Sequence, residues 1–496
     1  MKRIPGSFRK NMMTAVALLL TVPGWSSVWF TSPDGTGSDC TQNSPCGLRT
    51  AMGSGSLNDG DTVYLSEGNY TYTNGGILPT VRIGKSISLL GGWDKAAAGS
   101  PVRNPREYVS IIDGEGKRRG ILIDPDLNVT LDGFTVTNAF SDDRGAALYD
   151  ENATALTLND INFSSNRVEN DTEGYLYGGA AYIRGGDIRI TDCLFSKNSA
   201  MKGQYDSKGG GLYLADVNLT MENSILSENG AYDGSALYVY GDSVTVKHSR
   251  FDSNGRRMDV GHQMGFYPAV RFFVHSLTVS RSVFSANYTR SYYLFHAYAD
   301  TAQLEGNRFA DNSSQYDTVR LESIDSLLAT NNIFVRNLST SSTDEHSAVR
   351  IKGTKGRFIN NTVSDNADIG ILVGDDSDMR LINDIVTGQD EGIRIEIRSN
   401  VDADHLLLDN VQNLVTDSGS TAAVENNVTG DPAFANPSEG DYHIRFVSAA
   451  RDTGADVNVT EDIDGDFRPA GKGYDIGADE FAGSAMQPAL IHYLLQ

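Results

Sequence analysis

Short runs of alternating apolar and polar residues, separated by Gly, Asn, Asp and Ser, occupy most of the chain. The segment "GGLYLADVNLTMENSILSEN" (Gly210 to Asn229) is representative, because Leu212 and Leu214 flank Tyr213 and a second alternating run, "LTMENSIL", follows. Alternation predicts strands whose successive side chains point to opposite faces, so the two leucines face a core and Tyr213 faces outward. No long stretch of this region has helical periodicity.

Two motifs repeat along this pattern. The first is a Gly-rich turn followed by a strand, as in "GGAAYI" from Gly178, "GGGLYL" from Gly209 and "GSALYV" from Gly234. The second is an apolar residue followed three places later by Asn, and it ends at Asn166, Asn198, Asn229, Asn254, Asn287, Asn312, Asn337 and Asn366. The spacing between these Asn residues varies while the motif stays fixed, which indicates one strand-turn unit with a loop of variable length.

Strands this closely spaced, with no helices between them, do not form a βαβ sheet. They fit the coils of a parallel β-helix, in which each coil pairs with the next and the inward side chains form one continuous core. An Asn at the same corner of each coil adopts left-handed geometry and bonds the Asn of adjacent coils, forming a ladder. Turn formers in a β-sandwich are the alternative, but a sandwich would not keep one motif in register eight times.

The paired "GGA/GGL" strands and "FxxN" corners resemble the repeat of secreted right-handed β-helix proteins, including polymorphic outer-membrane-type and pectate-lyase-like families. The segment from Ser32 to Thr71 resembles their N-terminal region, which implies a short capping helix around Leu48 to Met52. The segment from Gly430 to Phe481 is similar to the end of choice-of-anchor Q proteins. The resemblance implies an all-β fold, a single right-handed parallel β-helix (solenoid) of roughly ten or more coils with a short N-terminal capping helix.

Five segments follow from these features. We expect a signal peptide over residues 1–26, an N-terminal cap over 27–60, the parallel β-helix over 61–415, a choice-of-anchor-Q-like region over 416–481 and a tail over 482–496. Basic residues precede the apolar run from Met12 to Val22, which is too short to cross a bilayer and is typical of a secretory signal. An uncleaved anchor is the alternative. We therefore expect a secreted or cell-surface bacterial protein with no transmembrane span.

Three cysteines and a strong negative charge fit this compartment. Cys40 and Cys46 flank "TQNSP" and are candidates for a small disulfide loop, whereas Cys193 lies in an alternating strand and is expected in the core. The net charge of −23 argues against a nucleic-acid partner, which would require Lys and Arg to neutralise phosphates. We expect a monomer.

Aligning the first strand of each coil predicts one outward stripe, aromatic in its first half and cationic in its second. Its members are Tyr149, Tyr182, Tyr213, Tyr238, Arg271, Tyr298, Arg320, Arg350, Leu372 and Arg394. Tyrosine rings stack on sugars and Arg binds carboxylates or sulfates, so the leading hypothesis is a face that binds extracellular, possibly anionic, polysaccharide, as in an adhesin. The alternative is a structural ladder, with Glu322 and Glu396 as partners for the arginines.

Two further hypotheses remain open. A polysaccharide lyase of the pectate or alginate type would cleave anionic glycans by β-elimination, with Arg320, Arg350 and Lys352 as the best cations, although Asp300 is the one Asp on this face. A structural surface stalk would bind no ligand. Asp462, Asp464 and Asp466 alternate in "EDIDGDFRP", which resembles half of a Ca²⁺ loop and also fits a plain acidic turn.

Overall fold

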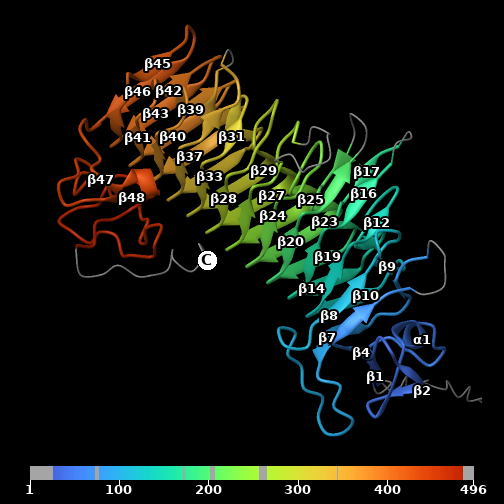
Figure 1. Cartoon of the computed structure of the whole chain (residues 1–496). Coiled ribbons are helices and arrows are strands. Elements are labelled where there is room, and N and C mark those ends of the chain that lie inside the picture. Colours follow the sequence, from blue (N-terminus) through green and yellow to red (C-terminus); the bar gives the residue numbers. More distant parts are fainter. Residues whose placement is uncertain are drawn as a thin grey trace, which may run out of the picture.

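A computed structural model describes residues 26–72, 78–170, 174–201, 207–255, 265–342 and 345–483. The chain winds into an elongated parallel β-helix, with its N-terminal coils and α1 at one end (Figure 1). The predicted capping helix is confirmed, since α1 spans Leu48–Met52 and buries Leu48 and Ala51. The predicted signal peptide lies outside the described residues except for Ser26, as does the predicted tail from residue 484 onward.

Each coil contains three strand positions, which we call the first, second and third strands. The first strands lie in the larger, 26-stranded sheet. They are β6 (Val81–Ile83), β9 (Ile121–Ile123), β13 (Leu148–Asp150), β18 (Ala181–Arg184), β23 (Leu212–Glu222), β25 (Leu237–Lys247), β27 (Val270–Ser280), β29 (Phe295–Glu305), β32 (Asp317–Glu322), β36 (Ser347–Lys352), β39 (Ile369–Gly374), β42 (Glu391–Ile395) and β45 (Gln412–Thr416). In β23, β25, β27 and β29 the strand continues without a break into the second position.

The other second strands share this sheet, and β2 and β3 join it near the N-terminus. They are β1 (Val28–Thr31), β4 (Thr62–Ser66), β7 (Ser88–Trp93), β10 (Asn128–Asp132), β14 (Ala155–Asn159), β19 (Asp187–Thr191), β33 (Ser326–Thr330), β37 (Lys355–Ile359), β40 (Asp378–Ile382), β43 (Asn400–Asp404) and β46 (Thr421–Glu425). The short hairpin of β2 (Thr36–Thr41) and β3 (Ser44–Cys46) contains the Cys40–Cys46 disulfide, which confirms that predicted pairing.

The third strands form a separate parallel sheet of 13 strands, which agrees with the expected ten or more coils. They are β5 (Gly68–Tyr70), β8 (Ser110–Asp113), β11 (Thr135–Thr137), β15 (Asn162–Ser164), β20 (Leu194–Ser196), β24 (Ile225–Ser227), β26 (Arg250–Asp252), β28 (Val283–Ser285), β30 (Arg308–Ala310), β34 (Ile333–Val335), β38 (Thr362–Ser364), β41 (Ile385–Thr387) and β44 (Leu407–Asp409).

Short strands pair in the loops that leave the third strands, and two more form a hairpin near the C-terminus. The loop strands are β12 (Phe140–Ser141), β16 (Arg167–Glu169), β17 (Leu176–Tyr177), β21 (Ser199–Met201), β22 (Ser207–Lys208), β31 (Ser313–Ser314) and β35 (Leu338–Ser339). The hairpin consists of β47 (Phe434–Asn436) and β48 (Asp441–Ile444), which the 3-10 turn Pro437–Glu439 connects.

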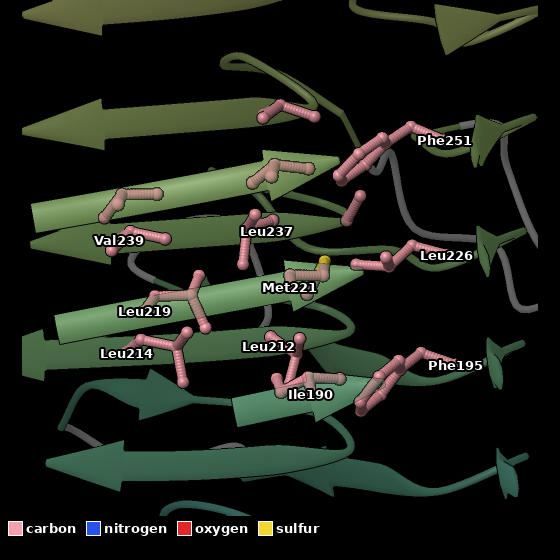
Figure 2. Close-up of a cluster of buried hydrophobic side chains, with 14 of the residues drawn as sticks. Ile190, Phe195, Leu212, Leu214, Leu219, Met221, Leu226, Leu237, Val239 and Phe251 are labelled. Carbon is pink, nitrogen blue, oxygen red and sulfur yellow. The ribbon is translucent and has the colours of Figure 1, made fainter. Parts of the chain in front are cut away.

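One continuous core fills the β-helix, as the alternating pattern predicts. Figure 2 shows Phe195, Leu226 and Phe251 of the third strands facing the apolar side chains of the larger sheet. Phe251 and Phe284 stack with 4.7 Å between ring centroids, and Phe284 and Phe309 with 4.5 Å. Cys193 is a buried free thiol whose pKa burial raises to about 12, so it belongs to the core and is no nucleophile.

The predicted Asn ladder is confirmed, with one correction to its geometry. All eight motif residues from Asn166 to Asn366 are buried and form one hydrogen-bonded column. The left-handed residue of each corner is the one before the Asn, as at Ser253 (φ 54°) and Ala286 (φ 54°). The Asn side chain itself turns inward, donating to its neighbour's amide oxygen and to a backbone carbonyl, so its value at the corner is hydrogen bonding.

Candidate functional site

The register of the first strands brings the predicted stripe together on one face. Consecutive coils pair Tyr149, Tyr182, Tyr213, Tyr238, Arg271, His296, Arg320, Arg350, Leu372 and Arg394, which we call the first row. Two residues further along each strand, a second row on the same face contains Arg184, Ala215, Tyr240, Phe273, Tyr298, Glu322, Lys352 and Gly374.

One predicted member of the stripe is in the wrong register. β29 pairs with β27 so that His296 lies beside Arg271, and Tyr298 lies beside Phe273 in the second row. The inward positions of β29 include Ala297 and Ala299, both fully buried. Because alanine has too little bulk to mark a core position in the sequence, the large ring of Tyr298 misleads the alignment by two residues.

The first-row tyrosines form a stacked column. Ring centroids are 5.4 Å apart for Tyr149–Tyr182 and Tyr182–Tyr213, and 5.3 Å for Tyr213–Tyr238. The ring of Tyr177 in β17 stacks on the ring of Tyr213, with their centroids 4.4 Å apart. Tyr182 and Tyr238 are only 4% and 8% exposed. Burial raises the pKa of Tyr238 to about 12. The ring faces are therefore in contact with one another, an arrangement that stabilises the coils.

The first-row arginines are paired with carboxylates. Arg271 contacts the buried Asp233 at 2.5 Å, and Asp317 contacts both Arg320 (3.5 Å) and Arg350 (3.1 Å). The two acids that the sequence suggests as partners are confirmed, because Glu322 contacts Arg320 at 3.0 Å and Glu396 contacts Arg394 at 3.7 Å. Arg394 makes its shortest ion pair, at 2.6 Å, with Glu391. Most of the positive charge of this row is thus balanced within the protein.

A mixed cluster lies where the tyrosines give way to arginines. His296 Nε2 lies 3.2 Å from Glu322 Oε2, which also accepts from Arg320 Nε at 3.0 Å, and the ring of Tyr293 lies 4.6 Å from the Arg320 guanidinium. The hydrogen bond from His296, aided by the charge of Arg320, lowers the pKa of Glu322 to about 2. Burial lowers the pKa of His296. At neutral pH this site therefore holds a carboxylate and an uncharged imidazole.

Beside this cluster, three second-row aromatic side chains lie in register on adjacent strands. Tyr240 of β25 pairs with Phe273 of β27, which pairs with Tyr298 of β29. Tyr240 is 56% exposed and Tyr298 is 45% exposed, while Phe273 is half-buried. Phe273 and Tyr298 are tilted by 45° with centroids 6.2 Å apart. Sequence reasoning places Tyr298 in the other row and misses Tyr240 and Phe273, because only the register reveals that the three are neighbours.

A polar edge borders these rings. His275 and Asp300 follow Phe273 and Tyr298 by two residues, and their side chains meet at 2.7 Å in an exposed pair. The hydrogen bond that His275 donates to Asp300 raises the pKa of His275. On the coils beyond Tyr298, Lys352 contacts Glu322 at 3.5 Å and Asp375 at 3.3 Å while keeping 34% of its side chain exposed. Arg320, Arg350 and Lys352 are thus gathered as predicted, each beside an acid.

The acidic "EDIDGD" segment does not act as one ligand set. Asp462 is buried, and its Oδ1 accepts the backbone N–H groups of Asp464 and Asp466, while its Oδ2 accepts that of Glu480. Asp464 instead points to His443, at 2.7 Å. Among the described residues, the ligand atoms that converge closely enough to share an ion belong to His443, Asp464 and Asp479, and not to the three alternating aspartates.

Comparison with known proteins agrees with this architecture. The family model "Right handed beta helix region" matches residues 108–271, which defines the class as a right-handed parallel β-helix, as predicted. No curated protein matches the sequence. In the described part of the chain, no helix has the length and apolar character needed to cross a bilayer.

The chain is also similar, at low identity, to several solved structures. A mannuronan C-5 epimerase A-module from Azotobacter vinelandii is 13% identical, with 81% of this chain and 97% of that chain covered and a TM-score of 0.39. A mannuronic acid-specific family 6 lyase from human gut microbiota is 12% identical (80% and 91% covered, TM-score 0.37), and pectate lyase Pel9A is 12% identical (92% and 96% covered, TM-score 0.28). Likeness of this degree assigns no activity to the chain.

Proposed function

We propose that the protein is a secreted, monomeric β-helix that binds extracellular polysaccharide along the face where Tyr240, Phe273 and Tyr298 project. The observation that carries this proposal is the row of aromatic side chains in register on adjacent coils, with both outer tyrosines about half exposed. Contiguous exposed apolar surface marks interaction sites, and aromatic rings pack against the apolar faces of sugars. Successive coils are about 4.8 Å apart, close to the length of one sugar residue.

The first row lies beside this platform on the same face and contacts it. Tyr238 lies 6.0 Å from the ring of Phe273, and the Arg271 guanidinium lies 5.4 Å from it. These contacts hold Phe273 in one orientation, which reduces the entropy lost when a glycan packs on it. Of the residues that the sequence predicts as glycan contacts, Tyr238 and Arg271 therefore act by positioning Phe273, and Tyr298 belongs to the platform itself.

An anionic polysaccharide fits the C-terminal side of the platform. Arg350 and Lys352 lie two coils beyond Tyr298 and keep 26% and 34% of their side chains exposed. A uronic-acid carboxylate that reaches them replaces Asp375 or Glu322 as the partner of Lys352. The disulfide between Cys40 and Cys46 supports a location outside the cell, where oxidising conditions preserve such bonds.

A second candidate function is β-elimination of the same polysaccharide, which the grouping of His296, Arg320 and Glu322 favours. In that reaction a cation stabilises the uronic carboxylate, a base removes the proton on the adjacent ring carbon, and the glycosidic C–O bond breaks. A carbon–carbon double bond forms, and the departing oxygen takes up a proton. His296 Nδ1 is buried without a hydrogen-bond partner among the described residues, so it has free capacity for a proton.

Retention on immobilised alginate, pectate and glycosaminoglycans, with and without Ca²⁺, tests the proposal. We expect the wild type to be retained and the triple variant Tyr240→Ala, Phe273→Ala, Tyr298→Ala to elute freely. Tyr175→Ala is the matched control, because Tyr175 is 60% exposed and lies outside both rows. Equal retention of the triple variant and the control would refute the platform.

The ultraviolet absorbance of unsaturated uronic products, followed in the same samples, separates binding from cleavage. Product formation that disappears in Arg350→Ala or Lys352→Ala would establish the lyase in place of simple binding. If the wild type neither binds nor cleaves any of these polymers, the proposal is overturned, and a structural surface stalk is the hypothesis that remains.

A further inference from the structure

A second site lies away from the platform, where the C-terminal segment folds back on the β-helix. Figure 1 shows β47 and β48 beside the strands of the last coils. Tyr442 of β48 donates to Asp365 at 2.9 Å, and Ala478 N–H donates to Thr362 Oγ1 at 3.0 Å. Tyr442 and Ala478 pack with Val335 of β34 in a small apolar cluster separate from the main core. The Ile463 N–H donates to the Ala478 carbonyl at 3.0 Å, so three chain segments, around residues 441–444, 461–467 and 475–481, lie against one another.

His443, Asp464 and Asp479 converge between those segments, and we call them the His443 cluster. One nitrogen of His443 and one oxygen from each aspartate all lie within 4.8 Å of one another. The Asp464 side chain is 7% exposed and Asp479 is 7% exposed, whereas His443 keeps 30% of its side chain exposed. The ligand atoms are therefore shielded on the aspartate side, with an opening at the imidazole.

The orientation of His443 is set by a third acid outside the cluster. Asp441 Oδ1 lies 2.5 Å from His443 Nδ1 and also accepts the His443 backbone N–H at 3.1 Å. Because this carboxylate keeps a proton on Nδ1, an ion that displaces the proton shared by Nε2 and Asp464 Oδ2, which lie 2.7 Å apart, meets the Nε2 lone pair. A carboxylate that fixes the far nitrogen of an imidazole is the usual support for a metal-binding histidine.

The charge balance around the cluster is negative. Asp479 accepts one hydrogen bond, from Ile444 N–H at 2.7 Å, and no cation in the described part of the chain makes an ion pair with it. The nearest buried arginine, Arg468, pairs with Glu480 at 3.1 Å, both side chains being fully buried. Burying a carboxylate is costly unless a positive charge is paired with it, and one imidazole lies between these carboxylates. A bound cation would therefore stabilise the cluster.

We propose that His443, Asp464 and Asp479 bind one divalent transition-metal ion of the Zn²⁺ class, which ties the C-terminal segment together. Imidazole nitrogen with carboxylate oxygen suits Zn²⁺, whereas Ca²⁺ and Mg²⁺ take oxygen ligands. Bonds of about 2.0–2.2 Å place the ligand atoms about 3–3.5 Å apart, so the 2.7 Å contact between His443 and Asp464 lengthens slightly when the ion binds. The exposed side of His443 leaves the fourth position to water.

Zinc titration of the full-length, EDTA-treated protein tests this site by calorimetry and by metal analysis after gel filtration. We expect one Zn²⁺ per chain and a higher thermal midpoint with Zn²⁺ than with EDTA. Asp479→Asn is the sharpest variant, because an amide oxygen still accepts from Ile444 N–H while the charged ligand is lost. It should remain folded in EDTA, as circular dichroism reports, and retain no stoichiometric Zn²⁺.

Two further variants complete the test. Asp441→Asn should weaken Zn²⁺ binding about 10–100-fold, because it removes the support of the imidazole and no ligand. His275→Gln is the matched control, since His275 also pairs with an aspartate at 2.7 Å but belongs to no group of three converging ligands in the described part of the chain. This variant should bind Zn²⁺ as the wild type does. The proposal is overturned if the wild type binds no stoichiometric Zn²⁺, or if Asp479→Asn binds Zn²⁺ with unchanged affinity. Asp441, His443 and Asp464 would then form a chain of ion pairs without a metal.

Discussion

Replacing Asn287 with alanine in the middle of the Asn ladder should be among the most damaging polar substitutions in this protein. The Asn287 side chain donates to Phe251 O at 2.8 Å and to Asn312 Oδ1 at 3.1 Å. Its Oδ1 accepts both the backbone N–H of Asn254, at 2.9 Å, and the Asn254 side-chain amide, at 3.0 Å. The side chain is 1% exposed, so water does not replace these bonds unless the coil opens.

The expected cost follows from the groups left behind. Alanine leaves three buried partners unpaired, namely the Phe251 carbonyl and two N–H groups of Asn254, and each costs about 1–3 kcal/mol. Partial relaxation brings the total to about 4 kcal/mol, which is a large part of the 5–15 kcal/mol that stabilises a typical domain. Urea denaturation followed by far-ultraviolet circular dichroism measures this loss.

Asn218→Ala provides the matched control. Asn218 is exposed and donates to Asp187 at 2.9 Å, so its removal should change the free energy of unfolding by no more than about 0.5 kcal/mol. If Asn287→Ala and Asn218→Ala unfold at the same urea concentration, the ladder contributes no more than a surface contact, and the reasoning fails.

Further predictions concern Tyr213 and two acids, the buried Asp150 and the half-buried Glu322. Tyr213→Ala should lower the free energy of unfolding by about 2–4 kcal/mol, whereas Tyr213→Phe, which keeps the stacked ring, should cost less than about 1 kcal/mol in urea denaturation. Burial raises the pKa of Asp150 to about 7 from 3.8, so its charge destabilises the fold as the pH rises from about 4 through 7. Asp150→Asn should therefore be more stable than the wild type by up to about 4 kcal/mol at pH 8 and equal to it at pH 4, in urea titrations at both pH values. The pKa of Glu322 is lowered to about 2 from 4.5. The ionised carboxylate therefore stabilises the fold fully above pH 4.5, and this stabilisation is lost as the pH falls towards 2. Glu322→Gln should be less stable than the wild type at pH 6, and the difference should shrink towards pH 2 in thermal melts.

The repeat was sufficient to predict the fold, because residues of the repeat mark the register of the strands in the sequence. Inward Leu, Ile, Val and Phe alternate with polar residues, and one Asn marks the same corner of every coil. The Cys40–Cys46 bridge follows from the local sequence as well, whereas the cap at Leu48–Met52 was implied by the resemblance to other β-helix proteins. The left-handed residue before each Asn could not be predicted, since Ser, Lys, Glu, Ala, Asp and Arg all occupy it and none marks it.

The candidate sites were harder to predict because they depend on contacts between coils. Tyr240, Phe273 and Tyr298 are unremarkable in their own strands and become a platform only through pairing. The sequence suggests Glu322 and Glu396 as partners for the first-row arginines but does not reveal the partner of Arg271, Asp233, which lies in a preceding loop. His443 and Asp479 are 36 residues apart in the numbering and meet only because the C-terminal segment folds back on the third strands.

Hydroxyl-radical footprinting with and without alginate tests the central proposal most directly, because it reports which side chains the polysaccharide covers. The account predicts that alginate lowers the oxidation rates of Tyr240, Phe273 and Tyr298 several-fold, while the rate at Tyr175, which is 60% exposed, stays unchanged. If alginate is retained by the protein and these three residues are oxidised as fast as before, polysaccharide binds elsewhere and the account of this face is wrong.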